Sequence, residues 1–150
     1  MKTIRVEGGD LSVSVGQVLN YVHGQDKLLQ DLELWLKEPL GQGYTTPNFG
    51  SLLEDQIGQL LTPETQTIIV NEIERVLGLY QNWQIEMLKK AKALNTLSYW
   101  TPGEILDRVS SITSTVLGDT LRVNISVVTL ENRTVGLEVL VGSSGISVQT

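Results

Sequence analysis

The spacing of apolar residues changes along the chain, and each change marks a predicted element. Apolar and polar residues alternate through residues 3–22, with glycines as breaks, which is typical of short strands joined by turns. From Gln25 onward the apolar residues recur at helical spacing. Pro39 must end this helix, because proline has no amide hydrogen and its ring clashes with the preceding turn.

Residues 39–50 are rich in glycine and proline, a composition that predicts a loop. After this loop, Ser51 and Glu54 have the Ser-x-x-Glu spacing of a capping box, in which each side chain satisfies a free amide of the first helical turn. The short helix predicted here is expected to bury Leu52, Leu53, Ile57 and Leu60. Thr62-Pro63-Glu64 is a second helix start, with a hydroxyl cap, a proline at a tolerated position and a carboxylate at the positive helix end.

The helix that starts at this second signal is the most informative element. If residues 64–94 are helical, they span about 46 Å, whereas a compact domain of this size has a radius of gyration of roughly 15 Å, so one end is expected to project. Its apolar residues follow one another at alternating steps of three and four, like a coiled-coil seam. These residues are Ile69, Ile73, Val76, Tyr80, Trp83, Met87, Ala91 and Leu94.

Two interpretations of this stripe remain open. Up to Tyr80 we expect the stripe to lie on the sheet of its own domain. Beyond that point the spacing fits an internal contact and a partner helix equally, and residues 83–100 form either a projecting helix end or an insertion. The candidate partner-binding residues in this half of the helix are Trp83, Met87, Ala91 and Leu94.

Beyond Pro102 the pattern predicts a small antiparallel sheet. Residues 121–129 and 135–141 alternate between apolar and polar, with turns at Gly118-Asp119 and at residues 131–133. Residues 104–117 fit either a strand or a short helix, and we predict a strand.

The last residues, 143–150, are predicted to form a flexible arm. Glycine and serine at positions 142–145 are typical of a linker. Ile146 and Val148 alternate like a strand that has no partner in its own domain, so we expect them to pair with a strand of a neighbouring subunit. A frayed terminus is the alternative.

Together these elements predict a single α+β domain over residues 1–150, in which a small antiparallel sheet packs against two or three helices and one long helix partly projects. The formal charge of −6 and the lack of grouped basic residues argue against nucleic-acid binding. The chain has no cysteine, which rules out disulfides. No apolar run is long enough to span a membrane, and residues 1–5 reach charge too soon for a signal peptide, so we expect the chain to fold in a cytoplasm.

Patterns that indicate catalysis or metal binding are weak. His23 is the only histidine, which argues against a Ser-His-Asp triad and against a His-rich metal site. Two pairs of carboxylates remain, Glu54 with Asp55 and Glu104 with Asp107, but adjacent acids on helix surfaces are usually solvated. We therefore predict no enzyme activity, no cofactor and no metal.

Several short patterns occur in order along the first half of the chain. The run that begins at Val22 ends in Trp35-Leu36, Pro39-Leu40-Gly41 follows, and Pro47 and Phe49-Gly50-Ser51 complete the set. This set resembles the baseplate wedge proteins of contractile tails, the family of gene product twenty-five of T-even phages and the W protein of temperate phages, shared with related injection systems. The resemblance covers residues 10–82 well and residues 104–142 loosely. The Glu-Pro-Arg signature that the family carries before its sheet is out of register here, where residues 100–104 keep only the proline.

The resemblance implies a structural role. A baseplate wedge protein docks on other wedge components and offers a surface to the first ring of tail tube or sheath, in multiple copies. We therefore expect a virion component assembled in the host cytoplasm, with wedge proteins and tube or sheath subunits as partners and without nucleic-acid or membrane partners. Two alternatives are a peptidoglycan-degrading tail lysozyme, a label that this family has long carried, and a cytoplasmic helical adaptor unrelated to phage.

Overall fold

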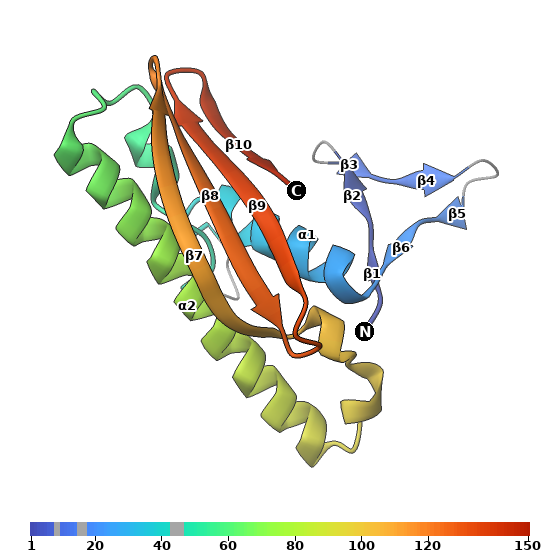
Figure 1. Ribbon diagram of the computed structural model, residues 1–150. Coiled ribbons are helices and arrows are strands. Elements are labelled where there is room, and N and C mark those ends of the chain that lie inside the picture. Colours follow the sequence, from blue (N-terminus) through green and yellow to red (C-terminus); the bar gives the residue numbers. More distant parts are fainter. Residues whose placement is uncertain (8–9, 15–17, 43–46) are drawn as a thin grey trace.

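The C-terminal part of the chain forms a four-stranded antiparallel sheet. The computed structural model describes residues 1–7, 10–14, 18–42 and 47–150. The strands of the sheet are β7 (Leu106–Leu117), β8 (Thr120–Thr129), β9 (Thr134–Gly142) and β10 (Gly145–Gln149). They lie in the order β10-β9-β8-β7, so each pairs with its neighbour in sequence (Figure 1). The predicted turns and the strand predicted for residues 104–117 are confirmed.

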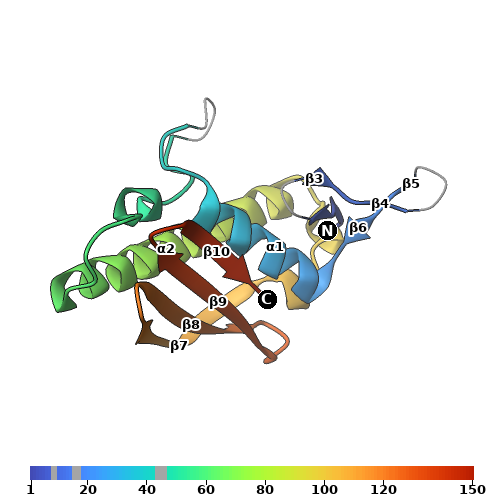
Figure 2. The ribbon, with the colours of Figure 1, turned by 90° about the horizontal axis from the view of Figure 1, so that it is seen from above.

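Two helices cover one face of this sheet, α1 (Gly24–Lys37) and α2 (Pro63–Ala93) (Figure 2). The core between the layers is made of alternate residues of the strands and of one stripe on each helix. Its buried members include Leu28, Leu32, Leu36, Ile69, Ile73, Val76, Leu77, Tyr80, Leu121, Val123, Ile125, Leu137, Val139 and Val141. The predicted α+β class, with a small antiparallel sheet packed against helices, is therefore correct.

The start of α2 follows the predicted capping signal. The Thr62 side chain accepts a hydrogen bond from the Thr65 amide at 3.2 Å, and Pro63 occupies the first helical position. The helix is 31 residues long, and its C-terminal turns extend past the sheet before the chain returns through the short 3₁₀ helices η2 (Leu97–Tyr99) and η3 (Pro102–Glu104) (Figure 1).

The predicted capping box at Ser51 is wrong. The Ser51 hydroxyl donates instead to the Leu36 carbonyl at 2.6 Å, and this bond holds the loop against the end of α1. The segment after Ser51 forms only the single-turn 3₁₀ helix η1 (Leu53–Gln56), whose N-cap is Leu52. Of the four leucine and isoleucine residues expected to be buried, only Leu53 is, and Leu60 is 80% exposed.

Gly50 permits the close approach of this loop to α1. Its φ is +103°, and a Cβ atom there would lie 2.5 Å from the Glu38 carbonyl oxygen. On either side of this contact, the Ser51 amide donates to the Glu38 carbonyl and the Leu40 amide donates to the Ser51 carbonyl, at 2.8 and 2.9 Å. The Phe49-Gly50-Ser51 pattern thus fixes where the loop meets the end of the first helix.

The described residues of the N-terminal region form three two-stranded antiparallel ladders, as the alternating pattern predicts. They pair β1 (Thr3–Ile4) with β6 (Tyr21–Val22), β2 (Val6–Glu7) with β3 (Asp10–Leu11), and β4 (Val13–Ser14) with β5 (Val18–Leu19). Gln30 of α1 fastens the first segment, because its amide donates to the Ile4 carbonyl and accepts from the Val6 amide, both at 2.9 Å. The predicted breaks at Gly8-Gly9 and Gly16, and residues 43–46 of the predicted loop, lie outside the described residues.

Candidate interaction surfaces

The far half of α2 is largely covered by its own chain, which favours the internal contact among the two interpretations left open by the sequence. The Trp83 ring lies 6.1 Å from that of Trp35 and 5.8 Å from that of Tyr80, so it packs on the edge of the core. Ala91 is buried and Met87 is half-buried, whereas Leu94 is 73% exposed. The physical reason is that α1 and the returning segment after α2 contact this half of the helix.

The apolar surface left at this end of the molecule has different members. Leu94 is joined by Leu97 and Tyr99, which follow α2 directly and are exposed, Tyr99 by 69%. Of the four predicted residues, Leu94 is the most exposed, Trp83 and Met87 are half-buried, and Ala91 is buried, while Leu97 and Tyr99 belong to η2.

The C-terminal segment is a strand of the sheet, so the prediction of a flexible arm over 143–150 is wrong. Ile146 pairs with Val141 and Val148 pairs with Val139, and Val148 belongs to the hydrophobic core. Gly142 pairs with Gly145, which leaves Ser143 and Ser144 as a two-residue hairpin turn. The Ser143 hydroxyl donates to Asp119 at 2.6 Å, ties this turn to the β7–β8 turn and lowers the pKa of that carboxyl.

The outer edge of β7 is an open edge of the sheet. No other described strand pairs with it, and between Val109 and Leu117 every side chain is exposed except the half-buried Ile112. This stretch, VSSITSTVL, contains no charge and no proline. The register irregularities of β7 all lie before Ser111. Because edge strands are normally blunted by charges, prolines or bulges, the regularly paired part of this stretch, residues 111–117, presents an unprotected edge.

A buried polar network holds the start of β7 against both helices. Gln84 donates to the Glu104 carbonyl at 2.7 Å and accepts from the Leu106 amide at 2.9 Å. Its amide nitrogen also contacts the Tyr80 hydroxyl at 2.9 Å, and that hydroxyl donates to Asp31 at 3.2 Å. Gln84 therefore satisfies the backbone at the point where the sheet begins.

Two ionisable groups of this network have raised pKa values. Burial raises the pKa of the Asp31 carboxyl, although the charge and hydrogen bond of Lys27 oppose this. Burial, followed by the charge of Asp31, also raises the pKa of Tyr80, so its hydroxyl keeps the proton that it donates. Lys27 is itself buried and lies with its Nζ 5.8 Å from the centre of the Trp100 ring. The network is thus an internal support for the fold.

The carboxylate pairs considered for catalysis are not assembled into a site. Glu54 and Asp55 are exposed at η1. Glu104 is fully buried, accepts a hydrogen bond from the Thr101 amide at 2.6 Å and contacts the amino group of Met1, while Asp107 pairs with Arg108 at the surface. In the part of the chain that the structure describes, no three His, Cys, Asp or Glu residues gather in a way that could hold a metal ion.

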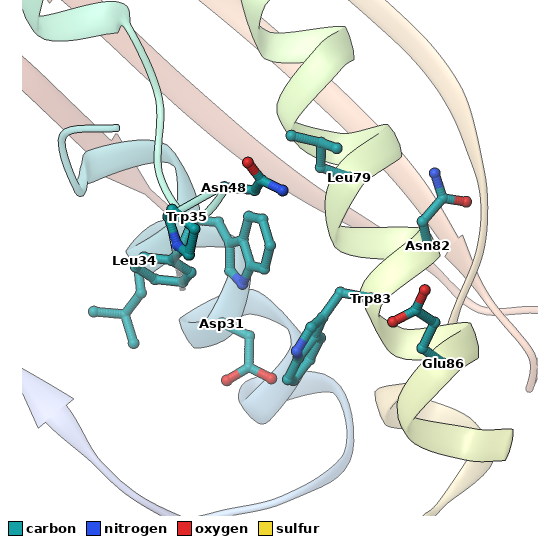
Figure 3. A pocket seen from close by; sticks show the side chains of 10 residues that line it. Asp31, Leu34, Trp35, Asn48, Leu79, Asn82, Trp83 and Glu86 are labelled. Carbon is teal, nitrogen blue, oxygen red and sulfur yellow. The ribbon is translucent and has the colours of Figure 1, made fainter. Parts of the chain in front are cut away.

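A groove of about 550 Å³ opens between α1, α2 and the loop before Gly50 (Figure 3). Its floor is aromatic, because Trp35 and Phe49 meet edge to face at 4.8 Å and Trp83 lies beside them. The residues that line it are Asp31, Leu34, Trp35, Pro47, Asn48, Phe49, Leu79, Asn82, Trp83 and Glu86. Sequence reasoning missed this groove, since its residues come from three separate segments.

Comparison with known proteins yields no relative. No protein-family model matches the chain, and neither a curated protein nor a solved structure matches it significantly. Among the described residues, no helix has the length and apolar character required to cross a bilayer.

Proposed function

We propose that this chain is a structural component of a contractile-tail baseplate, which docks on wedge proteins and helps to nucleate the tube or sheath. The resemblance of residues 10–82 to the wedge family supports the proposal, as does the order of helix, Phe49-Gly50 loop, second helix and C-terminal sheet. The observation that carries it is the unprotected outer edge of β7. In this proposal the protein occurs in several copies in the virion, with tube or sheath subunits and other wedge proteins as its partners.

The edge of β7 is suited to strand addition. Its outward backbone N–H and C=O groups can pair with an extended segment of a neighbouring subunit, while alternate side chains set the register. The Gln84 network fixes the start of β7, so the strand is ordered before a partner arrives and little conformational entropy is lost on binding. The sheet of the wedge family resembles the interlocking domain of the tail sheath, which agrees with this mode of contact.

Single proline substitutions at Thr113 and Ser114 test strand addition. In an antiparallel strand the N–H and C=O of one residue point to the same neighbour, and those of the next residue point the opposite way. One of the two prolines therefore removes a bond to β8, where Thr113 pairs with Asn124 and Ser114 with Val123, and should lower the free energy of unfolding by about 3 kcal/mol. The other removes an outward donor and should cost about 1 kcal/mol or less.

The stable proline variant is the informative one. Tails assembled with that variant should lack the next ring when viewed by electron microscopy. Complete tails from the stable variant would rule out pairing at this edge, and so would an assembly defect that occurs only in the destabilised variant.

We also propose that the chain acts without catalysis. The enclosure of Glu104 by the Thr101 amide and the Met1 amino group supports this, because a glycosidase acid must reach its substrate. Glu54 is exposed at η1, where surface acids are usually solvated. The purified chain is expected to leave the turbidity of a cell-wall suspension unchanged. Clearing that disappears in Glu54→Gln or Glu104→Gln would instead establish the tail lysozyme.

A further inference from the structure

The groove between α1 and α2 has the chemistry of a site for a basic side chain. We propose that it binds a segment of a partner protein in which a lysine or arginine is flanked by apolar residues. The proposal does not depend on strand addition at β7 or on the tail assignment, because it rests on the composition and geometry of the groove alone.

The aromatic floor suits both parts of such a side chain. The rings of Trp35, Phe49 and Trp83 line the groove. The centroid of the Trp35 ring lies 4.8 Å from that of Phe49 and 6.1 Å from that of Trp83. The faces of these rings attract a cation, and their area can bury the methylene stem of a lysine or arginine. Leu34 and Leu79 add aliphatic surface at the rim for the neighbouring apolar residues.

The charge of the groove has one sign. Asp31 and Glu86 line it, and none of its ten lining residues is basic. Figure 3 shows their carboxylates on the two sides of the Trp83 indole. Glu86 is exposed and forms no ion pair with any described residue.

Asp31 contributes through one of its two oxygens. Its Oδ2 is occupied by Lys27 and by the Tyr80 hydroxyl, whereas Oδ1 accepts no hydrogen bond from the described residues. Lys27 is not among the residues that line the groove, and its buried ammonium lies 5.8 Å from the centre of the Trp100 ring. An incoming cation would therefore meet Glu86, the free oxygen of Asp31 and an aromatic surface.

The remaining polar groups favour a protein segment over a free amine. Asn48 and Asn82 are exposed in the groove, and each amide can both donate to and accept from a peptide backbone. A free amine would leave these amides and most of the apolar floor uncovered. A peptide of three or more residues covers both.

The test uses the intact chain and the peptide acetyl-Leu-Lys-Leu-amide as the probe. The chain has three tryptophans, so their indole N–H resonances report the site directly. Titration should shift the signals of Trp35 and Trp83 and leave that of Trp100 unmoved. Replacing the central lysine by norleucine should weaken binding about tenfold, since the cation loses its aromatic and carboxylate contacts.

Charge reversal at the rim supplies a matched control. Glu86→Lys should weaken binding of the lysine peptide about tenfold. Glu74 is exposed on the same helix, and Glu74→Lys makes the same change in charge, so it should change the affinity by less than about twofold. Butylamine should bind at least about tenfold more weakly than the peptide.

Four results would overturn the proposal. They are no shift of Trp35 or Trp83 at tens of millimolar peptide, equal binding of the norleucine peptide, equal loss in the two charge-reversal variants, or a butylamine affinity that equals that of the peptide.

Discussion

Replacing Gln84 with leucine should lower the free energy of unfolding by about 4 kcal/mol. Leucine fills nearly the same volume but leaves the Leu106 amide and the Glu104 carbonyl, both buried partners of Gln84, without hydrogen bonds. It also removes the contact to the Tyr80 hydroxyl. Because each unsatisfied buried group costs about 1–3 kcal/mol, the loss should far exceed what the added apolar surface returns. Urea denaturation followed by circular dichroism measures the change.

Gln81→Leu is the matched control. Gln81 precedes Gln84 by one turn of α2 and donates to the Asp107 carbonyl at 2.6 Å, but it is only half-buried. Water can replace its single bond, so the cost should be about 1 kcal/mol or less. Equal losses in the two variants would mean that the buried network contributes no more than a surface hydrogen bond does.

The Gln84 network also shows what the apolar pattern could not predict. The steps of three and four from Ile69 to Tyr80 identified α2 and the face that it buries, since a regular apolar stripe is the strongest signal of a helix. The apolar pattern did not include Gln84, because its side chain is polar. Its position four residues after Tyr80, on the same face of the helix, was the signal that could have found it.

The stripe from Trp83 to Leu94 could not be assigned to an internal or an external contact for a related reason. Apolar residues at alternating steps of three and four indicate that one face of a helix is covered, but they do not indicate which part of the protein, or which partner, covers it. Here the cover comes from α1, through Trp35, and from the segment that returns after α2. A helix that contacts its own domain and one that contacts a second chain need the same stripe, so the sequence alone left both open.

The strands β8 and β9 were predictable, whereas the hairpin that joins β9 to β10 was not. Strict alternation in β8 and β9 identified both strands and the face that each buries. The composition of residues 142–145 fits a flexible linker and a tight hairpin equally well. In the structure Gly142 pairs with Gly145, so the segment is a hairpin with a two-residue turn. Because β10 pairs with the outer side of β9, β9 is not an edge strand, and the unprotected edge of the sheet is that of β7.

Removing residues 143–150 should lower the free energy of unfolding by at least about 3 kcal/mol. The deletion takes away the whole of β10, including Val148, whose side chain belongs to the core, and Ile146, which packs against it. Burial of one valine is worth about 1.5–3 kcal/mol, and the backbone groups of β9 that pair with β10 would lose their partners as well. The measurement is the urea midpoint of the truncated chain against that of the full chain, with the slope monitored for a change in compactness.

A point substitution separates this packing effect from a general effect of shortening the chain. Val148→Asn should cost about 3 kcal/mol, because it removes buried apolar surface and places an amide in the core. Gln149→Asn, at the next and exposed position of β10, should stay within about 0.5 kcal/mol of the unmodified chain. If the truncated chain and Val148→Asn both keep full stability, β10 is dispensable to the fold, and the segment is free to act as an arm toward a neighbouring subunit.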